Sequence, residues 1–187
     1  MGGLALDQVR SALRAYADWN RSEARSVFER ERALNAYDHA LDEQQLELLA
    51  RRSPVASDLR RIISFSKAVS ELERVGDEAK KIARVVSEEE PPAAEVVRDV
   101  LELGRHAESL LQRALIAFDE LDSASAVDIV AADKILDREY DAAMGRLVAR
   151  AAPDSDHIRL TVRAAFVLKS LERIGDHARN LARLLQG

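Results

Sequence analysis

Carboxylates spaced four residues apart are the side chains of this chain with the clearest chemical use. Glu73 and Asp77 form one such pair, and Glu172 and Asp176 form another. Within a helix the members of each pair share one face, because the chain turns once in about 3.6 residues. Like charges at this spacing destabilise a helix by roughly a few tenths of a kcal/mol. A hard cation would offset that repulsion, since carboxylate oxygens are ligands of magnesium, calcium, manganese and iron.

Both pairs lie inside a repeated segment. Residues 72–84 read LERVGDEAKKIAR and residues 171–183 read LERIGDHARNLAR, so eight of thirteen positions are identical. A repeat of roughly 100 residues is too long for a solenoid unit and has the size of a small domain. In each copy a glycine, Gly76 or Gly175, separates the two acids, although glycine costs roughly 1 kcal/mol inside a helix. Close helix packing and clearance for a ligand or metal explain this glycine equally well.

The second copy has a matching acidic pair on the preceding segment. Asp133 and Asp137 precede Pro153 by nearly the same distances along the chain at which Glu172 and Asp176 follow it. In an antiparallel hairpin folded at this proline, positions at similar distances from the turn lie side by side. The sequence therefore predicts that four carboxylates come together in the second half.

The first copy repeats this spacing around Pro54, with one substitution. Glu31 lies as far before the proline as Asp77 lies after it, and Asn35 lies as far before it as Glu73 lies after it. Asn35 therefore stands where the second half has a carboxylate. We predict a metal centre in each half. The alternative is a set of solvated helix faces, because acidic pairs arise often in a chain that is 33% charged.

Long helices are expected to carry these side chains. Apolar residues recur at steps of three and four, and all four prolines, at positions 54, 91, 92 and 153, fall between such stretches. This pattern predicts an all-α fold of two pseudo-symmetric three-helix bundles, residues 1–90 and 91–187. We expect helices at 4–19, 22–52, 54–87, 93–119, 125–151 and 155–186. The first of these helices is then markedly shorter than its counterpart in the second half.

Composition excludes several classes of protein. The absence of cysteine removes disulfides, thiolate metal sites and cysteine nucleophiles. A net charge of −5 argues against a nucleic-acid partner, which demands a basic surface. No apolar run approaches the roughly 18 residues of a membrane span, and no signal segment precedes the first helix. We therefore expect a cytoplasmic protein with no nucleic-acid binding and no membrane insertion.

The basic side chains beside the acids have two interpretations. Arg74 and Arg173 each follow the first acid of a pair, Glu73 or Glu172, and we expect them to form ion pairs within the protein. Binding of phosphate or of a partner's carboxylate is the alternative. His177 and the other three histidines are expected to be polar surface residues, and none forms the Glu-x-x-His pattern of di-iron enzymes.

The chain resembles the PhoU family of phosphate-uptake regulators. LERVGD and LERIGDHA resemble the family signature in both of its repeats, and residues 54–60 (PVASDLR) are similar to the turn and helix start that precede it. The resemblance covers nearly the whole chain and implies two pseudo-symmetric three-helix bundles with multinuclear iron or zinc clusters on their surface. Magnesium and manganese are further candidates for the metal. The implied ligands are Glu31, Asn35, Glu73, Asp77, Asp133, Asp137, Glu172 and Asp176.

The resemblance also implies a regulator and not an enzyme. It implies repression of phosphate-starvation signalling and of phosphate uptake, through contact with the ATPase subunit of a phosphate ABC transporter and with a sensor histidine kinase. A homodimer is expected. No catalytic residue is implied, and the chain has no phosphate-binding glycine loop, dinucleotide fingerprint or nucleophile elbow. Two alternatives stay open: a di-metal carboxylate enzyme, and a helical cytoplasmic domain of a phosphate cotransporter.

Overall fold

Six α-helices make up the described part of this protein. The computed structural model describes residues 1–52, 56–151 and 155–186, and these ranges contain no strand. The helices are α1 (Gly2–Asp18), α2 (Arg21–Arg52), α3 (Ala56–Glu88), α4 (Ala94–Glu120), α5 (Ser123–Ala149) and α6 (Ser155–Arg183). Each begins and ends within a few residues of its predicted range. Pro54 and Pro153, where we expected two of the turns, lie outside the described residues.

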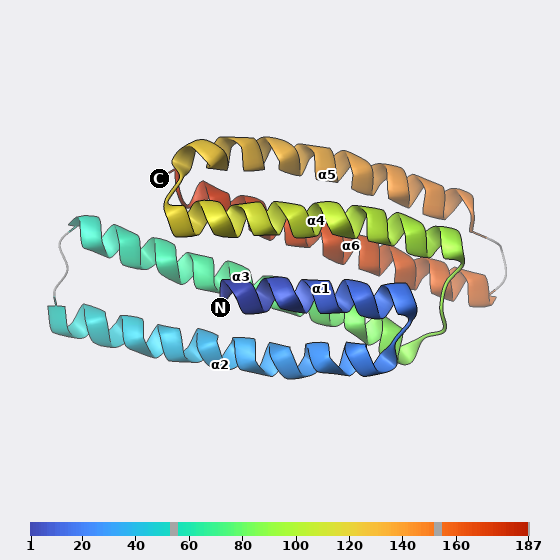
Figure 1. Cartoon of the computed structure of the whole chain (residues 1–187), viewed down its shortest axis with the longest axis horizontal. Coiled ribbons are helices and arrows are strands. Elements are labelled where there is room, and N and C mark those ends of the chain that lie inside the picture. The colour runs from blue at the N-terminus through green and yellow to red at the C-terminus, as the bar shows by residue number, and fades with distance from the viewer. Residues whose placement is uncertain (53–55, 152–154, 187) are drawn as a thin grey trace.

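The helices form two bundles that lie side by side, α1–α3 in one and α4–α6 in the other (Figure 1). α3 packs against α6 and α1 packs against α4, and these contacts join the bundles. The predicted architecture of two three-helix bundles is thereby confirmed. Buried side chains of both bundles belong to one hydrophobic core, which includes Val75 and Ile82 of α3 and Leu171 and Ile174 of α6.

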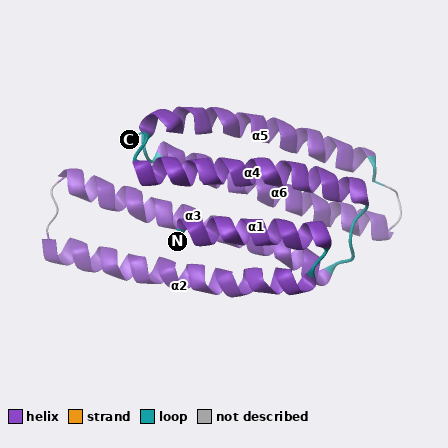
Figure 2. Cartoon of the chain, in the orientation of Figure 1, coloured by secondary structure: helices purple, strands orange, loops and turns teal. Residues whose placement is uncertain are grey.

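Short loops of the same conformation connect the first two helices of each bundle. Trp19 and Leu121 end α1 and α4 with positive φ angles of 48° and 55°, which non-glycine residues rarely adopt. The next residue, Asn20 or Asp122, accepts hydrogen bonds from the first backbone N–H groups of the following helix. The duplication therefore extends to the short loops, teal in Figure 2, that set where α2 and α5 begin.

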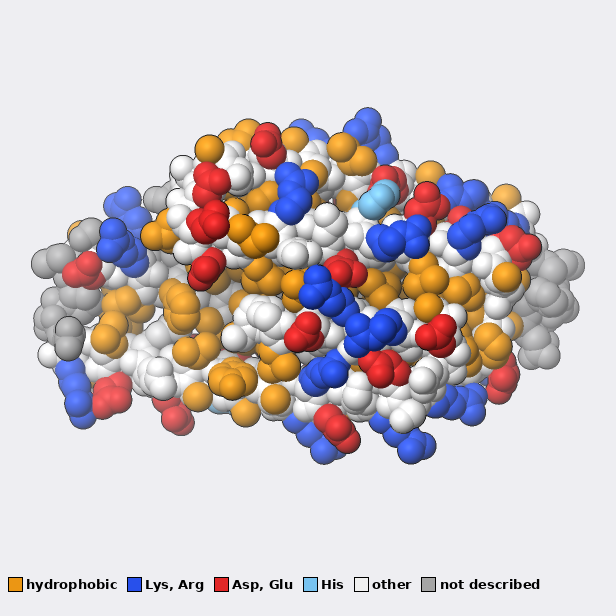
Figure 3. Space-filling model, in the orientation of Figure 1, with side chains coloured by type: hydrophobic (Ala, Val, Ile, Leu, Met, Phe, Trp, Pro, Cys, Tyr) orange, Lys and Arg blue, Asp and Glu red, His pale blue; other side chains and the backbone are white. Residues whose placement is uncertain are grey.

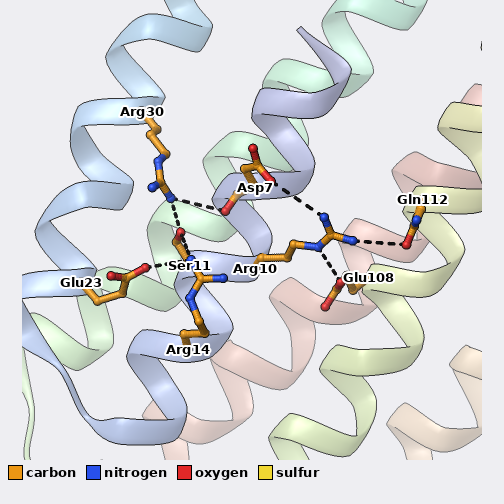
Figure 4. A network of polar contacts seen from close by, with 8 residues as sticks. All are labelled: Asp7, Arg10, Ser11, Arg14, Glu23, Arg30, Glu108 and Gln112. Atoms are coloured by element: carbon orange, nitrogen blue, oxygen red, sulfur yellow. Dashed lines mark hydrogen bonds and ion pairs between the residues drawn. The ribbon is translucent and has the colours of Figure 1, made fainter.

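Polar contacts hold α1 against α2 and against α4 (Figure 4). Arg10 donates to Glu108 Oε1 of α4 at 2.7 Å and to Gln112 Oε1 at 3.2 Å, and Arg14 donates to Glu23 Oε1 of α2 at 3.0 Å. Ion pairs this close to solvent contribute about 0–1 kcal/mol each. They therefore fix the register of α1 more than they stabilise the fold.

The glycine between the two signature acids is a packing requirement. A Cβ on Gly76 would clash with Leu34 Cδ2 of α2, and a Cβ on Gly175 would clash with Leu136 Cδ2 of α5. In both halves a leucine from the preceding helix packs on the bare glycine backbone. The Cβ position at Gly175 is also 3.5 Å from Asp133 Oδ1. Of the two explanations, close helix packing accounts for the glycine in both halves.

The first helices of the two bundles differ in length. α1 has 17 residues and α4 has 27, so the predicted difference is confirmed. As a result, α2 and α3 run on past the N-terminus of α1 (Figure 1). Among the described residues, no helix combines the length and the apolar character that crossing a membrane requires.

Candidate metal centres

The four acids predicted to come together in the second half lie on two adjacent helices. Asp133 and Asp137 belong to α5, and Glu172 and Asp176 belong to α6, which packs against it. Burial raises the pKa of Asp137 above its ordinary value, and the negative charges of the other three acids raise it further. The helical hairpin thus places the four carboxylates within electrostatic reach of one another.

Arg179 of α6 brings positive charge into this group. Asp133 is only 2% exposed, and its Oδ2 accepts a hydrogen bond from Arg179 Nη1 at 2.7 Å. The same nitrogen lies 2.5 Å from Asp176 Oδ1. Asp133 Oδ1 is buried and has no hydrogen-bond partner within the described residues. Because a buried polar atom without a partner costs roughly 1–3 kcal/mol, this oxygen is a candidate metal ligand.

Glu172 has a basic partner of its own. Lys169, one turn earlier on α6, places its Nζ 2.7 Å from Glu172 Oε2 and 5.4 Å from the centre of the Tyr140 ring. The hydrogen bond to Glu172 raises the pKa of Lys169. Lys169 and Arg179 together therefore neutralise part of the charge of the four carboxylates.

The first half repeats this arrangement around a buried glutamate. Glu31 Oε1 accepts hydrogen bonds from Lys80 Nζ of α3 at 2.6 Å and from Asn35 Nδ2 at 2.9 Å. Asn35 Oδ1 is buried and finds no hydrogen-bond partner in the described ranges. Lys80 and Arg179 occupy the same position of the two repeated segments. An internal cation, which the sequence-based reasoning missed, is thus duplicated together with the acids.

Glu73 and Asp77 of α3 complete the first group, together with an acid that the spacing argument overlooked. Burial raises the pKa of Glu73, and the charges of Asp77 and Asp38 raise it further. Asp38 stands three residues after Asn35 on α2, so the two side chains share a helix face. Asp38 therefore brings back the carboxylate that Asn35 lacks. The steps of four and three from Glu31 were the signal that could have revealed it.

The residues present fit a hard cation in their chemistry. They offer carboxylate oxygens in both halves, an amide oxygen in the first, and unpartnered buried oxygens at Asp133 and Asn35. In the part of the chain that the structure describes, however, no three acidic or histidine side chains stand together as a ready ligand set. Lys80 and Arg179 hold carboxylates that would have to turn toward a metal. Metal binding at these positions therefore stays a prediction.

The two acidic groups approach each other at the seam between α3 and α6. A hollow of about 420 Å³ there is lined by Asp77 from one signature and Asp176 from the other. Arg74 and Arg173 also line it, and both form the predicted ion pairs within the protein. Arg74 lies 3.4 Å from a carboxylate oxygen of Glu71, and Arg173 lies 3.3 Å from one of Glu78.

His177 is part of this seam and is not the polar surface residue that we expected. Its Nδ1 lies 2.7 Å from Glu71 Oε2, and Asn180 Nδ2 donates to the same oxygen at 3.1 Å. Although burial alone would raise the pKa of Glu71, these two hydrogen bonds hold it below its ordinary value. The expectation was wrong because α6 turns His177 toward α3 and away from solvent.

Comparisons with known proteins match nearly the whole chain. A model of the PhoU domain matches it twice, at residues 1–86 and 100–185. The phosphate-specific transport system accessory protein PhoU homolog of Pseudomonas aeruginosa is 42% identical over 189 residues, covering 99% of this chain and 77% of that protein. PhoU of Escherichia coli is 36% identical over 186 residues, with the same two shares. The crystal structure of PhoU from P. aeruginosa matches with a TM-score of 0.90 at 42% identity and covers 99% of this chain and 90% of that one. For the phosphate transport system regulatory protein PhoU from Streptococcus pneumoniae, the TM-score is 0.88 at 29% identity, with 98% and 87% covered.

Proposed function

This chain belongs to the PhoU family, and we propose that it is an accessory protein of a phosphate-specific transport system that represses phosphate uptake and phosphate-starvation signalling. One observation carries the proposal. The duplicated signature, residues 72–77 and 171–176, lies on α3 and α6, the helices that join the bundles, and the family model matches both halves. Both the sequence motif and its structural position therefore support a role shared with this family.

Metal binding is the finer part of the proposal. The ligands in the second half would be Asp133, Asp137, Glu172 and Asp176; in the first half they would be Glu31, Asn35, Glu73 and Asp77, joined by Asp38. A bound cation supplies the positive charge that lets acids on adjacent helices remain close. The acids themselves join α5 to α6 and α2 to α3, while Lys80 and Arg179 neutralise part of the charge.

The proposed role is regulatory and not catalytic. A di-metal enzyme needs an open coordination position beside a substrate pocket. The hollow next to Asp176 is lined by neither Asp133 nor Glu172, so it does not open onto the centre of the second acidic group. We propose instead that the chain works in the cytoplasm as a homodimer, through contacts with the transporter's ATPase subunit and with a sensor histidine kinase.

A binding experiment combined with complementation tests this role. The chain is immobilised and exposed to the purified phosphate-transporter ATPase and to the cytoplasmic part of the sensor kinase from the same bacterium. We expect at least one of them to bind, while the ATPase of an unrelated transporter does not. In a strain without its own PhoU protein, the chain should silence a phosphate-starvation promoter in phosphate-rich medium. Failure of both binding and silencing would contradict the proposal.

A further inference from the structure

A pocket between α3 and α6 gathers basic side chains. Its volume is about 470 Å³, and its lining among the described residues comes from these two helices. Basic residues outnumber acidic ones in this lining: Lys81, Arg84, Arg163, Lys169 and Arg173 against Glu78 and Glu88. On the face that α1 and α4 form, by contrast, basic and acidic side chains are interspersed (Figure 3). The pocket is therefore a basic site on a chain whose net charge is −5.

Two of these basic side chains share a single carboxylate oxygen. Lys81 Nζ lies 2.7 Å from Glu78 Oε1, and Arg173 Nη1 lies 3.3 Å from the same oxygen. Arg84 is exposed, and within the described ranges it forms no ion pair. The other two basic side chains of the lining each have an acidic partner outside it. Lys81, Arg84 and Arg173 thus have one paired acid among them, and an anion in the pocket would complete their pairing.

The pocket also offers a flat apolar surface. Phe166 lines it and is 60% exposed, although phenylalanine is among the residues that proteins most often bury. The buried side chains of Val85 and Val167 belong to the same lining. A ligand that matches this pocket therefore combines negative charge with a planar apolar group.

The duplication supplies an internal comparison for these residues, because positions 99 residues apart in α3 and α6 are equivalent. Three of the five basic residues have uncharged equivalents, and the exposed phenylalanine has a lysine. The pairs are Lys81 and Asn180, Arg163 and Ser64, Lys169 and Ser70, and Phe166 and Lys67. Both copies form the same helices without sharing these side chains. Packing of the bundles therefore does not account for the cations and the aromatic ring of the pocket.

We propose that this pocket binds a nucleoside polyphosphate. The base stacks on the ring of Phe166, and the phosphates pair with Lys81, Arg84 and Arg173. Guanidinium and ammonium groups form charge-assisted hydrogen bonds with phosphate oxygens, and every nucleobase has a flat face that stacks on an aromatic ring. The volume lies within the roughly 300–1,000 Å³ of small-molecule sites. Side chains thus hold the phosphates in place of the glycine loop that the chain lacks.

A nucleotide in this pocket contacts both bundles. Lys81 and Arg84 belong to α3, whereas Phe166 and Arg173 belong to α6. The ion pair of Arg173 with Glu78 already joins the two helices here, and the ligand adds a second link. Because a ligand that binds only the folded state stabilises it, nucleotide binding strengthens the contact between the bundles. The inference rests neither on metal binding nor on the proposed repression of phosphate uptake.

Isothermal titration calorimetry of the whole chain with ATP tests the proposal. EDTA is present throughout, so that no metal ion bridges ATP to the acidic groups. We expect saturable binding of one ATP per chain. Tripolyphosphate, which lacks the base, and adenosine, which lacks the phosphates, are the matched control ligands. Each should bind at least about tenfold more weakly than ATP, because each loses one of the two kinds of contact.

Substitutions of exposed residues separate the two kinds of contact. Arg84→Asn should weaken ATP binding about tenfold through lost hydrogen bonds to a charged group. Arg183→Asn, at the equivalent exposed position of the other copy, is the matched control and should leave the affinity unchanged. Phe166→Ala should weaken ATP binding about tenfold but leave the affinity for tripolyphosphate unchanged, because only the base is stacked. Its control is Ile158→Ala, an exposed apolar position of α6 outside the lining.

The outcomes separate a nucleotide site from general attraction of anions. Absence of ATP binding overturns the inference, and so does equal affinity for ATP and tripolyphosphate, because charge alone would then explain the binding. An equal loss of affinity in Arg84→Asn and Arg183→Asn also overturns it. Circular dichroism checks that each variant is folded. Lys81→Asn, which introduces the residue found in the other copy, should weaken ATP binding as Arg84→Asn does and so provides a second test of the phosphate contacts.

Discussion

Lys80 and Arg179 stand at the same position of the duplicated segment, and each pairs with a buried acid of the neighbouring helix, Glu31 or Asp133. Burying a carboxylate without a partner costs free energy. These ion pairs therefore let the protein fold with its acidic groups buried even before a cation binds. They also place an internal competitor at each candidate metal centre. Lys80 and Arg179 therefore stabilise the metal-free protein and, by the same contacts, lower its affinity for a metal.

Replacing Arg179 separates these two effects. We expect Arg179→Met to destabilise the metal-free protein by about 3 kcal/mol, because the charge of Asp133 would stay buried without its partner. The substitution also frees oxygens of Asp133 and Asp176, so added Mn²⁺ should restore stability in the variant more strongly than it stabilises the wild type. Urea unfolding in EDTA and in Mn²⁺ measures both effects.

Arg138→Met is the control, because Arg138 is exposed on α5 and its Nε donates only to a backbone carbonyl oxygen, that of Lys134. It should change neither stability nor the response to Mn²⁺ by more than about 0.5 kcal/mol. Equal stabilisation of the wild type and of Arg179→Met by Mn²⁺ would show that Arg179 does not compete with a cation.

At the scale of helices, periodicity and proline positions were enough to predict the fold. They also predicted that the acidic pair of α5 faces the pair of α6, since that follows from equal distances to a turn. The role of Arg179 could not be predicted in the same way, because the choice of partner depends on the rotamers and crossing angle of two helices. His177 was harder still, as its partner Glu71 lies far away in the sequence and in the other bundle.

A substitution at Gly175 tests how closely α5 and α6 must approach each other. We expect Gly175→Ala to destabilise the protein by about 1–2 kcal/mol, because overpacking against Leu136 outweighs the roughly 1 kcal/mol gained in helix propensity. In a Leu136→Ala background the clash disappears, so the same substitution should then cost nothing or stabilise. Thermal unfolding of the four proteins of this double-mutant cycle measures the coupling.

Gly145 provides the matched control on the neighbouring helix α5. A Cβ at this position meets nothing within 4 Å, so only helix propensity should act. Gly145→Ala should therefore stabilise by about 1 kcal/mol. If Gly175→Ala and Gly145→Ala shift stability in the same direction, the tight approach of α5 to α6 is not what requires the glycine.

The two bundles share a hydrophobic core and also a buried ionic joint, which is centred on Glu89. Glu89 follows α3 and is buried, and its carboxylate lies 2.8 Å from Arg163 and 2.9 Å from Arg159, both on α6. Its backbone carbonyl accepts a hydrogen bond from Trp19 Nε1 at 3.1 Å, at the end of α1. One residue thus ties the first helix and the α3–α4 connection to the last helix.

Because this joint links the two bundles, we expect the chain to unfold as one cooperative unit, although its sequence is a duplication. Trp19 is the sole tryptophan, so its fluorescence reports the joint, while far-ultraviolet circular dichroism reports all helices. In urea the two signals should share one midpoint. Glu89→Ala should lower the stability reported by both signals by about 2 kcal/mol, through lost hydrogen bonds to charged groups. The exposed neighbour Glu88→Ala should lower neither. Separate midpoints would mean that each bundle folds on its own, and the shared core could not then be the main source of stability.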